Sequence, residues 1–260
     1  MMEFDRDGLM REYESKSSIV HTYLDDLERL VIASNDVLEG NCFYVHASLH
    51  LYPELYTKQL NLYWCGKQSG SSSETPRICE IGLNAGHSAM LMLLPTLRYH
   101  EGSYHPTSLP VCDSQTGGLL GNVGSESVLL RTNMTIFDIG HHRYTRPCLN
   151  YLQSAFSNVD FEYVEGDSTV TMPEWIRNNK EHIGTYDVVH VDGGHSMHCI
   201  SNDMKHTDLL VKKNGIVIVD DTNVDYINSH VNMYIDTGNY VELPVNPTSG
   251  YPHRIIQRIR

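Results

Sequence analysis

The sequence predicts an α/β fold built on a mostly parallel sheet and preceded by a helical extension. Two observations carry this prediction. After residue 75, short apolar runs alternate with helical stretches, which is typical of strand–helix–strand units that pair in parallel. Near the end of the chain, two apolar runs flank residues 246–250, whose residue types favour a turn. The sheet is therefore expected to end in an antiparallel hairpin.

The first 75 residues are expected to be mostly helical. In residues 4–38, apolar side chains recur at helical spacing, with acidic side chains on the opposite side. A Tyr- and Leu-rich run at 44–64 follows, and the Gly- and Ser-rich stretch 66–73 is expected to be a flexible linker. Residues 1–75 then form a helical extension with its linker, and residues 76–260 form the main domain.

The main domain is expected to hold five strands before the hairpin, at residues 77–81, 134–139, 161–165, 186–192 and 215–220. Helices are expected to begin near residues 87, 143, 169 and 198, and another helix is expected over 223–238. The two hairpin strands are expected at 240–245 and 253–259. Residues 95–131 break the alternation, since they lack a period and are rich in Gly, Ser, Pro and Tyr. This insertion is expected to be either a lid or a disordered segment.

Composition excludes several classes of protein. The formal net charge of −13 argues against a nucleic-acid partner, because nothing offsets repulsion from the phosphates. No apolar run approaches the ~20 residues that cross a bilayer, and the charged start lacks a signal peptide, so a cytoplasmic protein with no membrane partner is expected. The six cysteines show no C-x-x-C spacing, which fits a reducing compartment better than a disulfide framework.

The loop after the first predicted strand has the residues of a ligand-binding turn. It reads E-I-G-L-N-A-G-H-S (80–88), and Gly82 and Gly86 permit a tight turn and close approach of a ligand. The next helix points its N-terminus at that position, where a carboxylate or phosphate is favoured. The loop lacks the second glycine of the dinucleotide fingerprint, which disfavours NAD. An ordinary strand–helix turn is the alternative.

Acidic residues also follow the second and third strands. In open α/β sheets, ligands bind beyond the carboxyl ends of the strands, which is where these acids are expected. Asp138 is placed to accept both hydroxyls of a ribose, with a helix cap or solvated turn as the alternative. Asp167 is placed to accept from an exocyclic amine, and Ser168 is expected to cap the next helix.

Carboxylates follow the fourth and fifth strands as well. Adjacent parallel strands would bring Asp192 and the pair Asp220-Asp221 to one rim. Clustered carboxylates repel one another unless a cation or proton lies among them, and oxygen ligands favour a hard cation such as Mg²⁺. His195 lies three residues beyond Asp192 and is the natural general base of this rim.

These motifs resemble those of class I S-adenosylmethionine-dependent methyltransferases. The most similar branch is that of the small O-methyltransferases, which includes catechol and macrolide-sugar enzymes. The resemblance covers residues 76–260 and rests on the 80–88 loop, V-E-G-D-S (164–168), V-D-G-G-H-S (191–196) and G-I-V-I-V-D-D-T (215–222). It implies a Rossmann-like, doubly wound sheet of seven strands that ends in the antiparallel hairpin.

The resemblance implies an activity and a set of site residues. The activity is transfer of a methyl group from S-adenosyl-L-methionine to a hydroxyl of a small molecule or carbohydrate, assisted by Mg²⁺ or another divalent cation. The implied cofactor-binding residues are Glu80, Gly82 and Gly86 for the methionine part, Ser88 for its carboxylate, Asp138 for the ribose, Asp167 and Ser168 for the adenine, and Asp192. The implied metal ligands are Asp192, Asp220 and Asp221, and the implied catalytic residues are His195 and Asp192. His195 stands where the catechol-type members carry lysine.

Several alternatives stay open at the level of sequence. A non-catalytic relative that serves as a partner or scaffold and an aminopropyltransferase-like enzyme share the expected sheet. The residues at the rim have alternatives of their own. The acids could be separate solvated turn residues, or His190, His195 and His198 could form a zinc site. The aromatic run either lines an acceptor pocket or packs in the core or against a second copy in a homodimer, and its members are Tyr44, Tyr52, Tyr56, Tyr63 and Trp64.

Overall fold

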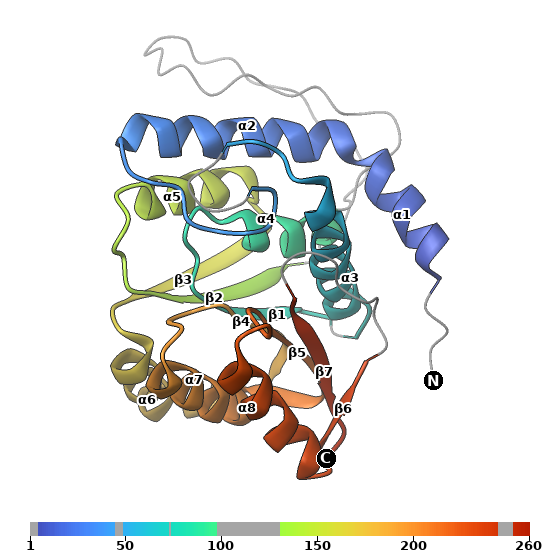
Figure 1. Ribbon diagram of the computed structural model, residues 1–260, viewed down its shortest axis with the longest axis vertical. Coiled ribbons are helices and arrows are strands. Elements are labelled where there is room, and N and C mark those ends of the chain that lie inside the picture. The colour runs from blue at the N-terminus through green and yellow to red at the C-terminus, as the bar shows by residue number, and fades with distance from the viewer. Residues whose placement is uncertain (1–4, 45–48, 73, 98–130, 244–251) are drawn as a thin grey trace, which may run out of the picture.

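A computed structural model describes residues 5–44, 49–72, 74–97, 131–243 and 252–260. It contains a seven-stranded sheet in the order β3-β2-β1-β4-β5-β7-β6, which lies between two layers of helices (Figure 1). The strands are β1 (Arg77–Ile81), β2 (Thr132–Asp138), β3 (Val159–Glu165), β4 (Tyr186–Val191), β5 (Val211–Val219), β6 (Tyr240–Glu242) and β7 (Arg254–Arg258). The first five pair in parallel, and β7 runs antiparallel to both β5 and β6. The predicted sheet and its closing hairpin are confirmed.

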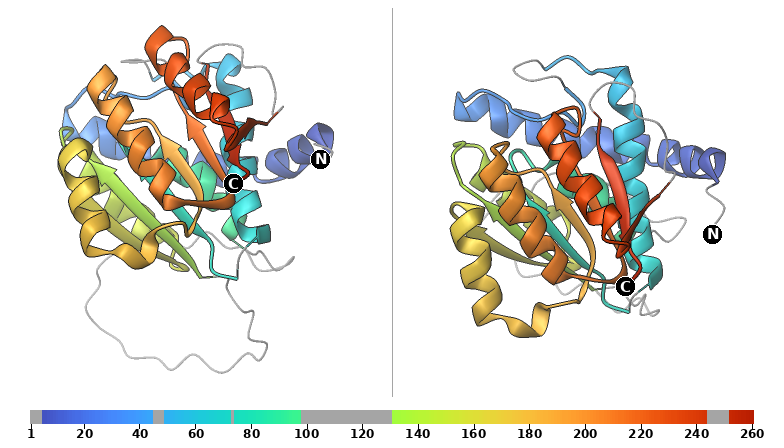
Figure 2. Two further views of the ribbon diagram at one scale, coloured as in Figure 1. Left: turned by 90° about the horizontal axis from the view of Figure 1, so that it is seen from below. Right: turned by 60° about the horizontal axis from the view of Figure 1, so that its bottom comes forward.

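The helices cover both faces of the sheet (Figure 2). One layer holds α1 (Arg6–Ser15), α2 (Ser17–Ser34), α3 (Tyr56–Ser72), α4 (His87–Leu93) and α5 (Thr145–Ala155). The other layer holds α6 (Ser168–Asn178), α7 (Met197–Leu210) and α8 (Asp225–Asp236). Short 3₁₀ turns occupy Pro53–Leu55, Leu94–Thr96 and Lys180–His182. No helix among the described residues is both long enough and apolar enough to cross a membrane.

Alternating side chains of the strands build two hydrophobic cores. In β4, Val188 belongs to the core under α1–α5, whereas its neighbour Val189 belongs to the core under α6–α8. This follows from the two-residue period of a strand, which sends successive side chains to opposite faces. Every residue of β4 is buried, as expected for a central parallel strand covered on both faces.

The expected linker at 66–73 is wrong, because residues 66–72 continue helix α3. The reason lies in packing: a Cβ atom on Gly66 would fall 1.9 Å from the carbonyl oxygen of Met92 in α4. Gly66 is therefore the point at which two helices touch backbone to backbone, and composition alone does not distinguish that from a flexible segment. Ser69, one turn later, is buried and donates its hydroxyl to the Gly66 carbonyl at 2.7 Å.

Helix α3 contacts a segment that lies far away in the sequence, next to strand β7. Its Asn61 lies 2.7 Å from Nε2 of His253, just before β7, and both side chains are buried. Residues of α1, α2 and α3 also share one hydrophobic cluster with strand residues such as Ile78. The expected helical extension is therefore present and packs directly on the sheet. The division of the chain at residue 75 stays a prediction.

Other expectations fall partly outside the described residues. Most of the 95–131 insertion and all of the 246–250 turn lie there, so the lid stays a prediction. In the aromatic run, Tyr44 and Tyr63 are core residues and Tyr52 is exposed. Core packing therefore accounts for part of that run.

Candidate functional site

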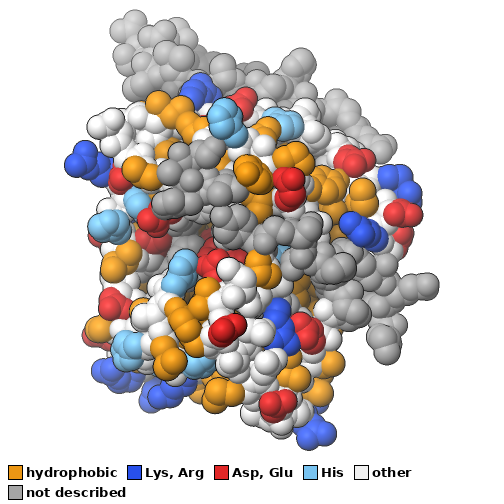
Figure 3. Space-filling model, viewed as in Figure 1, with side chains coloured by type: hydrophobic (Ala, Val, Ile, Leu, Met, Phe, Trp, Pro, Cys, Tyr) orange, Lys and Arg blue, Asp and Glu red, His pale blue; other side chains and the backbone are white. Residues whose placement is uncertain are grey.

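Two adjoining cavities open at the carboxyl ends of β1, β2 and β4. The first has a volume of about 480 Å³ and the second about 320 Å³. They share one wall, made of Glu39, Gly82, Asn84, Asp192, Gly193 and Gly194. A space-filling view shows acidic and histidine side chains beside a hollow in one face of the molecule (Figure 3). None of the five aromatic residues singled out in the sequence lines either cavity.

The glycine turn after β1 forms part of the shared wall. Gly82 has φ +91°, and a Cβ atom there would fall 2.0 Å from the carbonyl oxygen of Asp192. Only glycine fits this combination of backbone angle and close approach. Gly86 caps α4 with φ +79° and packs against Leu152, but it lines neither cavity. The turn thus brings the β1 and β4 loops into backbone contact.

Asp138 holds the glycine turn in shape. Its Oδ2 accepts hydrogen bonds from the backbone N–H groups of Leu83 at 2.7 Å and Asn84 at 3.0 Å. Its Oδ1 accepts from the N–H of Gly140 at 2.7 Å. Asp138 lines the second cavity, and its Oδ1 keeps a further lone pair for a hydroxyl donor, whereas Oδ2 already accepts two hydrogen bonds.

Glu80 lies beneath the first cavity rather than in its wall. It is completely buried, it accepts a hydrogen bond from the Ser88 hydroxyl, and its Oε1 lies 3.1 Å from Nδ1 of His190. Ser88 itself lines the first cavity. The other oxygen of Glu80 and Nε2 of His190 are buried without hydrogen-bond partners. Glu80 therefore acts on the cavity through Ser88.

The second cavity ends at the loop after β3. Asp167 and Ser168 line it, but the helix cap is Asp167, whose side chain accepts from the N–H of Thr169 at 2.9 Å. The expectation that Ser168 caps this helix is wrong, since Ser168 is already the first helical residue. Beneath this end lies Asp203 of α7, 1% exposed, and both of its carboxyl oxygens lack a hydrogen-bond donor. Burial raises the pKa of Asp203 to about 6.

Asp203 makes stability depend on pH in a predictable direction. Its folded pKa of about 6 exceeds the ordinary value, so the folded protein holds this proton more tightly than the unfolded chain. The stabilisation of the folded state by this bound proton is therefore complete below about pH 4, and it is lost as the pH rises through 6. Asp203→Asn has no proton to lose. Urea unfolding should show that the free energy of unfolding of wild type, relative to that of this variant, falls by about 2–3 kcal/mol between pH 4 and pH 7. A difference that does not change over this range would contradict the prediction.

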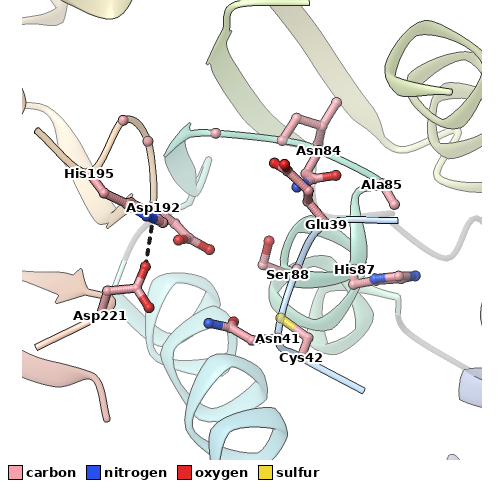
Figure 4. Close-up of a pocket in the computed structure, with 15 residues that line it drawn as sticks. Glu39, Asn41, Cys42, Asn84, Ala85, His87, Ser88, Asp192, His195 and Asp221 are labelled. Carbon is pink, nitrogen blue, oxygen red and sulfur yellow. Dashed lines mark ion pairs between the residues drawn. The ribbon is translucent and has the colours of Figure 1, made fainter. Parts of the chain in front are cut away.

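The rim of the first cavity is formed by Asp192, His195 and Asp221 (Figure 4). Nε2 of His195 lies 2.8 Å from Oδ2 of Asp221, and this hydrogen bond raises the pKa of His195. Burial, followed by the nearby Asp220, raises the pKa of Asp192 well above its usual range. Asp221 has φ +53°, a strained backbone for a residue other than glycine. Glu39 and Asn84 face this rim from across the cavity.

Asp220 lies behind the rim and pairs with a residue that sequence reasoning missed. Lys58 of α3 donates from its ammonium to Oδ2 of Asp220 and to the side-chain oxygen of Asn41. The Lys58 and Asp220 side chains are 2% and 1% exposed. Burial alone would raise the pKa of Asp220, but the Lys58 ammonium holds it at about 2. No local pattern around Lys58 indicates this partner, which is 162 residues away.

The rim residues form two groups that could hold a cation. Asp192 joins His190 and Asp220 in one group and His195 and Asp221 in the other, with ligand atoms within 4.8 Å of one another. The three aspartates are thus brought together around Asp192 but do not form a single group. Oδ1 of Asp220 is buried without a hydrogen-bond partner, and Asp192 is repelled by Asp220, so a cation here would give that oxygen a ligand contact and relieve the repulsion. The donor set fits a hard divalent ion.

The zinc site considered from sequence is not formed by the described residues. His190 is buried at the end of its strand, and His198 is exposed on α7 beside Asn202. His195 belongs to a different ligand group from His190, and His198 belongs to neither. The three histidines do not converge on one point.

Residues 36–44, here called the strap, lie over the shared wall of both cavities. His142 anchors the strap, since its Nδ1 is 3.3 Å from Asp36 and its Nε2 is 3.0 Å from Glu39. The Tyr144 hydroxyl accepts from the N–H of Glu39 at 3.1 Å and donates to the side chain of Asn84. Sequence reasoning missed the strap, because its acids carry no motif and its anchors lie about 105 residues away.

Comparison with known proteins gives one family and a set of similar folds. The model of a family described as a methyltransferase domain matches residues 79–222, more than half of the chain. No curated protein matches the chain in sequence.

Three solved structures illustrate the similar folds. Cofactor-bound Rv0187 from MTB is 11% identical with a TM-score of 0.55, over 100% of this chain and 99% of that one. An O-methyltransferase from Bacillus cereus in complex with SAH is 13% identical with a TM-score of 0.53, over 92% and 91%. Apo CalS11, a TDP-rhamnose 3'-O-methyltransferase of calicheamicin biosynthesis, is 15% identical with a TM-score of 0.52, over 90% and 93%. At such identities the likeness shows a shared fold.

Proposed function

The chain belongs to this family of methyltransferase domains, and from that premise we propose that it transfers a methyl group from S-adenosyl-L-methionine to a hydroxyl of a small molecule. The observation that carries the proposal is the pair of cavities that share Gly82 and Asp192. The second cavity offers the carboxylates of Asp138 and Asp167 to the hydroxyl and amine donors of a nucleoside. The first cavity has a histidine and carboxylates at its rim. Solved O-methyltransferases with the same fold support the choice of reaction.

The cofactor is proposed to lie across the shared wall. Asp138 would accept from the ribose hydroxyls, and Asp167 with Ser168 would border the adenine at the far end of the second cavity. Gly82 allows the backbone to approach the methionine part, and Ser88 in the first cavity would contact its carboxylate. Glu80 and Gly86 line neither cavity and would act on the cofactor indirectly. Glu80 holds Ser88 by a hydrogen bond, and Gly86 forms the start of helix α4.

The chemistry proposed for the rim needs one proton acceptor and one positioning site. S-adenosylmethionine supplies an electrophilic methyl group when it is bound. The acceptor oxygen would take that methyl group, and its hydroxyl proton would pass to Nδ1 of His195, because Nε2 of the same ring already faces Asp221. Asp221 orients this imidazole and stabilises the imidazolium that results. Asp192 and Asp220 would hold a divalent ion in the ligand group that they share, and the ion would lower the pKa of a bound hydroxyl.

The charges around the first cavity favour an acceptor without negative charge. Its described wall carries the carboxylates of Glu39, Asp192 and Asp221 but no Lys or Arg. Lys58, the nearby ammonium, is already paired with Asp220. A phosphorylated or nucleotide-linked acceptor would therefore be repelled, whereas a free carbohydrate or a phenol would not. A carbohydrate or other polyol is the finer proposal within the small-molecule class.

Replacing His195 with Gln is expected to lower kcat in a way that depends on the acceptor. Loss of a general base costs about 10²–10⁴-fold when the hydroxyl must be deprotonated by the enzyme. An acceptor whose hydroxyl is already largely ionised at the assay pH needs no base, so its kcat should fall much less. Rates for a series of phenols of decreasing pKa would measure this. An equal loss across the series would remove His195 from the role of base.

The proposed activity is tested by calorimetric titration with S-adenosylhomocysteine, followed by methyl-transfer assays over sugars and phenols with and without Mg²⁺. Tight binding with turnover supports the proposal. Binding without turnover over the panel would favour the non-catalytic partner or scaffold. Preference for the decarboxylated cofactor would favour an aminopropyltransferase-like enzyme. Absence of binding would contradict both the cofactor and the reaction. The homodimer, the cytoplasmic location and the lack of nucleic-acid and membrane partners stay predictions.

A further inference from the structure

Lys58 is an unusual residue to find beside this rim. It comes from the helical extension rather than from the sheet, and a lysine so fully buried requires partners that compensate for the loss of water. It has two such partners on different segments: Asp220 after β5 and Asn41 of the strap. The ammonium therefore connects three parts of the chain at a single point.

The two oxygens of Asp220 are in different situations. Oδ2 accepts from the Lys58 ammonium, whereas Oδ1 is buried and has no hydrogen-bond partner. Asp220 also shares a possible ligand group with Asp192, whose carboxylate lines both cavities. One contact thus fixes the carboxylate and leaves its other oxygen available toward the neighbouring acid.

We propose that Lys58 is a positioning residue for a divalent cation, since it fixes Asp220 through one oxygen and leaves the other to bind the ion beside Asp192. This inference rests on the metal assistance in the proposed function. Groups that bind the ligands of a metal commonly set the orientation of those ligands, and their loss weakens metal binding about 10–100-fold. Through Asn41, the same ammonium ties the strap to the ion site, so the wall of the first cavity and the ligand geometry are fixed together.

Charge alone predicts the opposite effect. A positive ammonium this close to the ion would repel it, so removal of Lys58 would tighten binding if repulsion dominated. The direction of the change therefore separates an orienting lysine from a lysine that merely competes with the ion. Lys58→Gln separates the two further, because its amide keeps an N–H donor for Asp220 without the charge.

The experiment measures Mn²⁺ binding by electron paramagnetic resonance in the presence of S-adenosylhomocysteine, without turnover. Wild type is compared with Lys58→Met and Lys58→Gln. We expect Lys58→Met to weaken Mn²⁺ binding about 10–100-fold and Lys58→Gln to recover part of that loss. The matched control is Lys212→Met, because Lys212 pairs with the buried Asp187 at the opposite ends of the same strands β4 and β5. That variant should lose stability and keep its Mn²⁺ affinity.

Each outcome decides the proposal. Unchanged or tighter Mn²⁺ binding in Lys58→Met overturns it, and so does an equal loss in Lys212→Met. If Lys58→Met does not fold, Lys58→Gln and Asn41→Ala carry the test, and wild-type affinity in both overturns it. If wild type binds no Mn²⁺, the metal assistance and this inference fall together. Retained binding of S-adenosylhomocysteine in the same samples would then show that the cofactor part of the proposed function stands.

Discussion

Asp192→Asn is expected to lower kcat by at least about 100-fold while the affinity for S-adenosylhomocysteine stays within a few-fold of wild type. Asparagine keeps the size of the side chain and one acceptor oxygen, so the shared wall of the two cavities stays in place. It removes the negative charge that would hold a cation and stabilise the reacting centre. Burial and the nearby Asp220 raise the pKa of Asp192, so its charge is disfavoured in the free protein and the neutral amide removes an unfavourable charge. We therefore expect no loss of stability.

The measurement combines single-turnover methyl transfer, calorimetry and urea unfolding. Asp160→Asn is the control, because Asp160 is an exposed carboxylate at the start of β3 that pairs only loosely with Arg131 at 3.8 Å. It should keep wild-type rates. Full activity in Asp192→Asn would remove the rim carboxylate from the reaction. A large loss of folding stability in that variant would mean that Asp192 is charged and paired in the free protein.

Gly82→Ala is expected to abolish cofactor binding and to lower the free energy of unfolding by about 3 kcal/mol. Two causes act together at this position. The backbone has φ +91°, which an L side chain rarely adopts, and the new methyl group would fall 2.0 Å from the carbonyl oxygen of Asp192. Since that neighbour is backbone, it cannot rotate away, and the β4 loop must shift. The shift would displace Asp192 and the wall that both cavities share.

Gly238→Ala provides the matched control. Its φ of +72° gives a comparable backbone strain, but no atom lies within 4 Å of the added Cβ. We expect a loss of about 1 kcal/mol and unchanged affinity for S-adenosylhomocysteine. Calorimetry and urea unfolding on both variants separate strain from clash. If Gly82→Ala binds the cofactor as well as Gly238→Ala does, the close approach at Gly82 has no bearing on the cofactor.

The sheet could be predicted because its strands carry strong local signals. Strand β1 occupies Arg77–Ile81, as expected, since a short run with three apolar residues in five, bounded by Pro76 and Gly82, favours a strand. The meeting of Asp192 with Asp220 and Asp221 was equally predictable. It follows from the parallel arrangement, which brings the carboxyl ends of β4 and β5 to one edge.

The contributions of the helical extension could not be predicted in the same way. Lys58 lies in a helix, and the acid at helical spacing from it in the sequence is Glu54, four residues earlier. Its partner in the structure is instead Asp220, which lies in a different part of the sequence. Glu39 of the strap likewise reaches the cavities only through tertiary packing on His142. A Gly- and Ser-rich stretch can be a flexible linker or a helix in close contact with another helix. The sequence around Gly66 does not distinguish the two, so the linker prediction was wrong.

The position of α3 has a consequence for the order of folding during synthesis. Asn61 contacts His253 across 192 residues of chain, and Lys58 contacts Asp220 across 162. Contacts this distant in sequence close last, because a long loop must lose its entropy before they form. A ribosome-bound chain that does not yet include Asp220 would have the glycine turn and the first strands but no completed rim. We therefore expect the growing chain to acquire its ion site only after β5 and the segment around His253 have been synthesised.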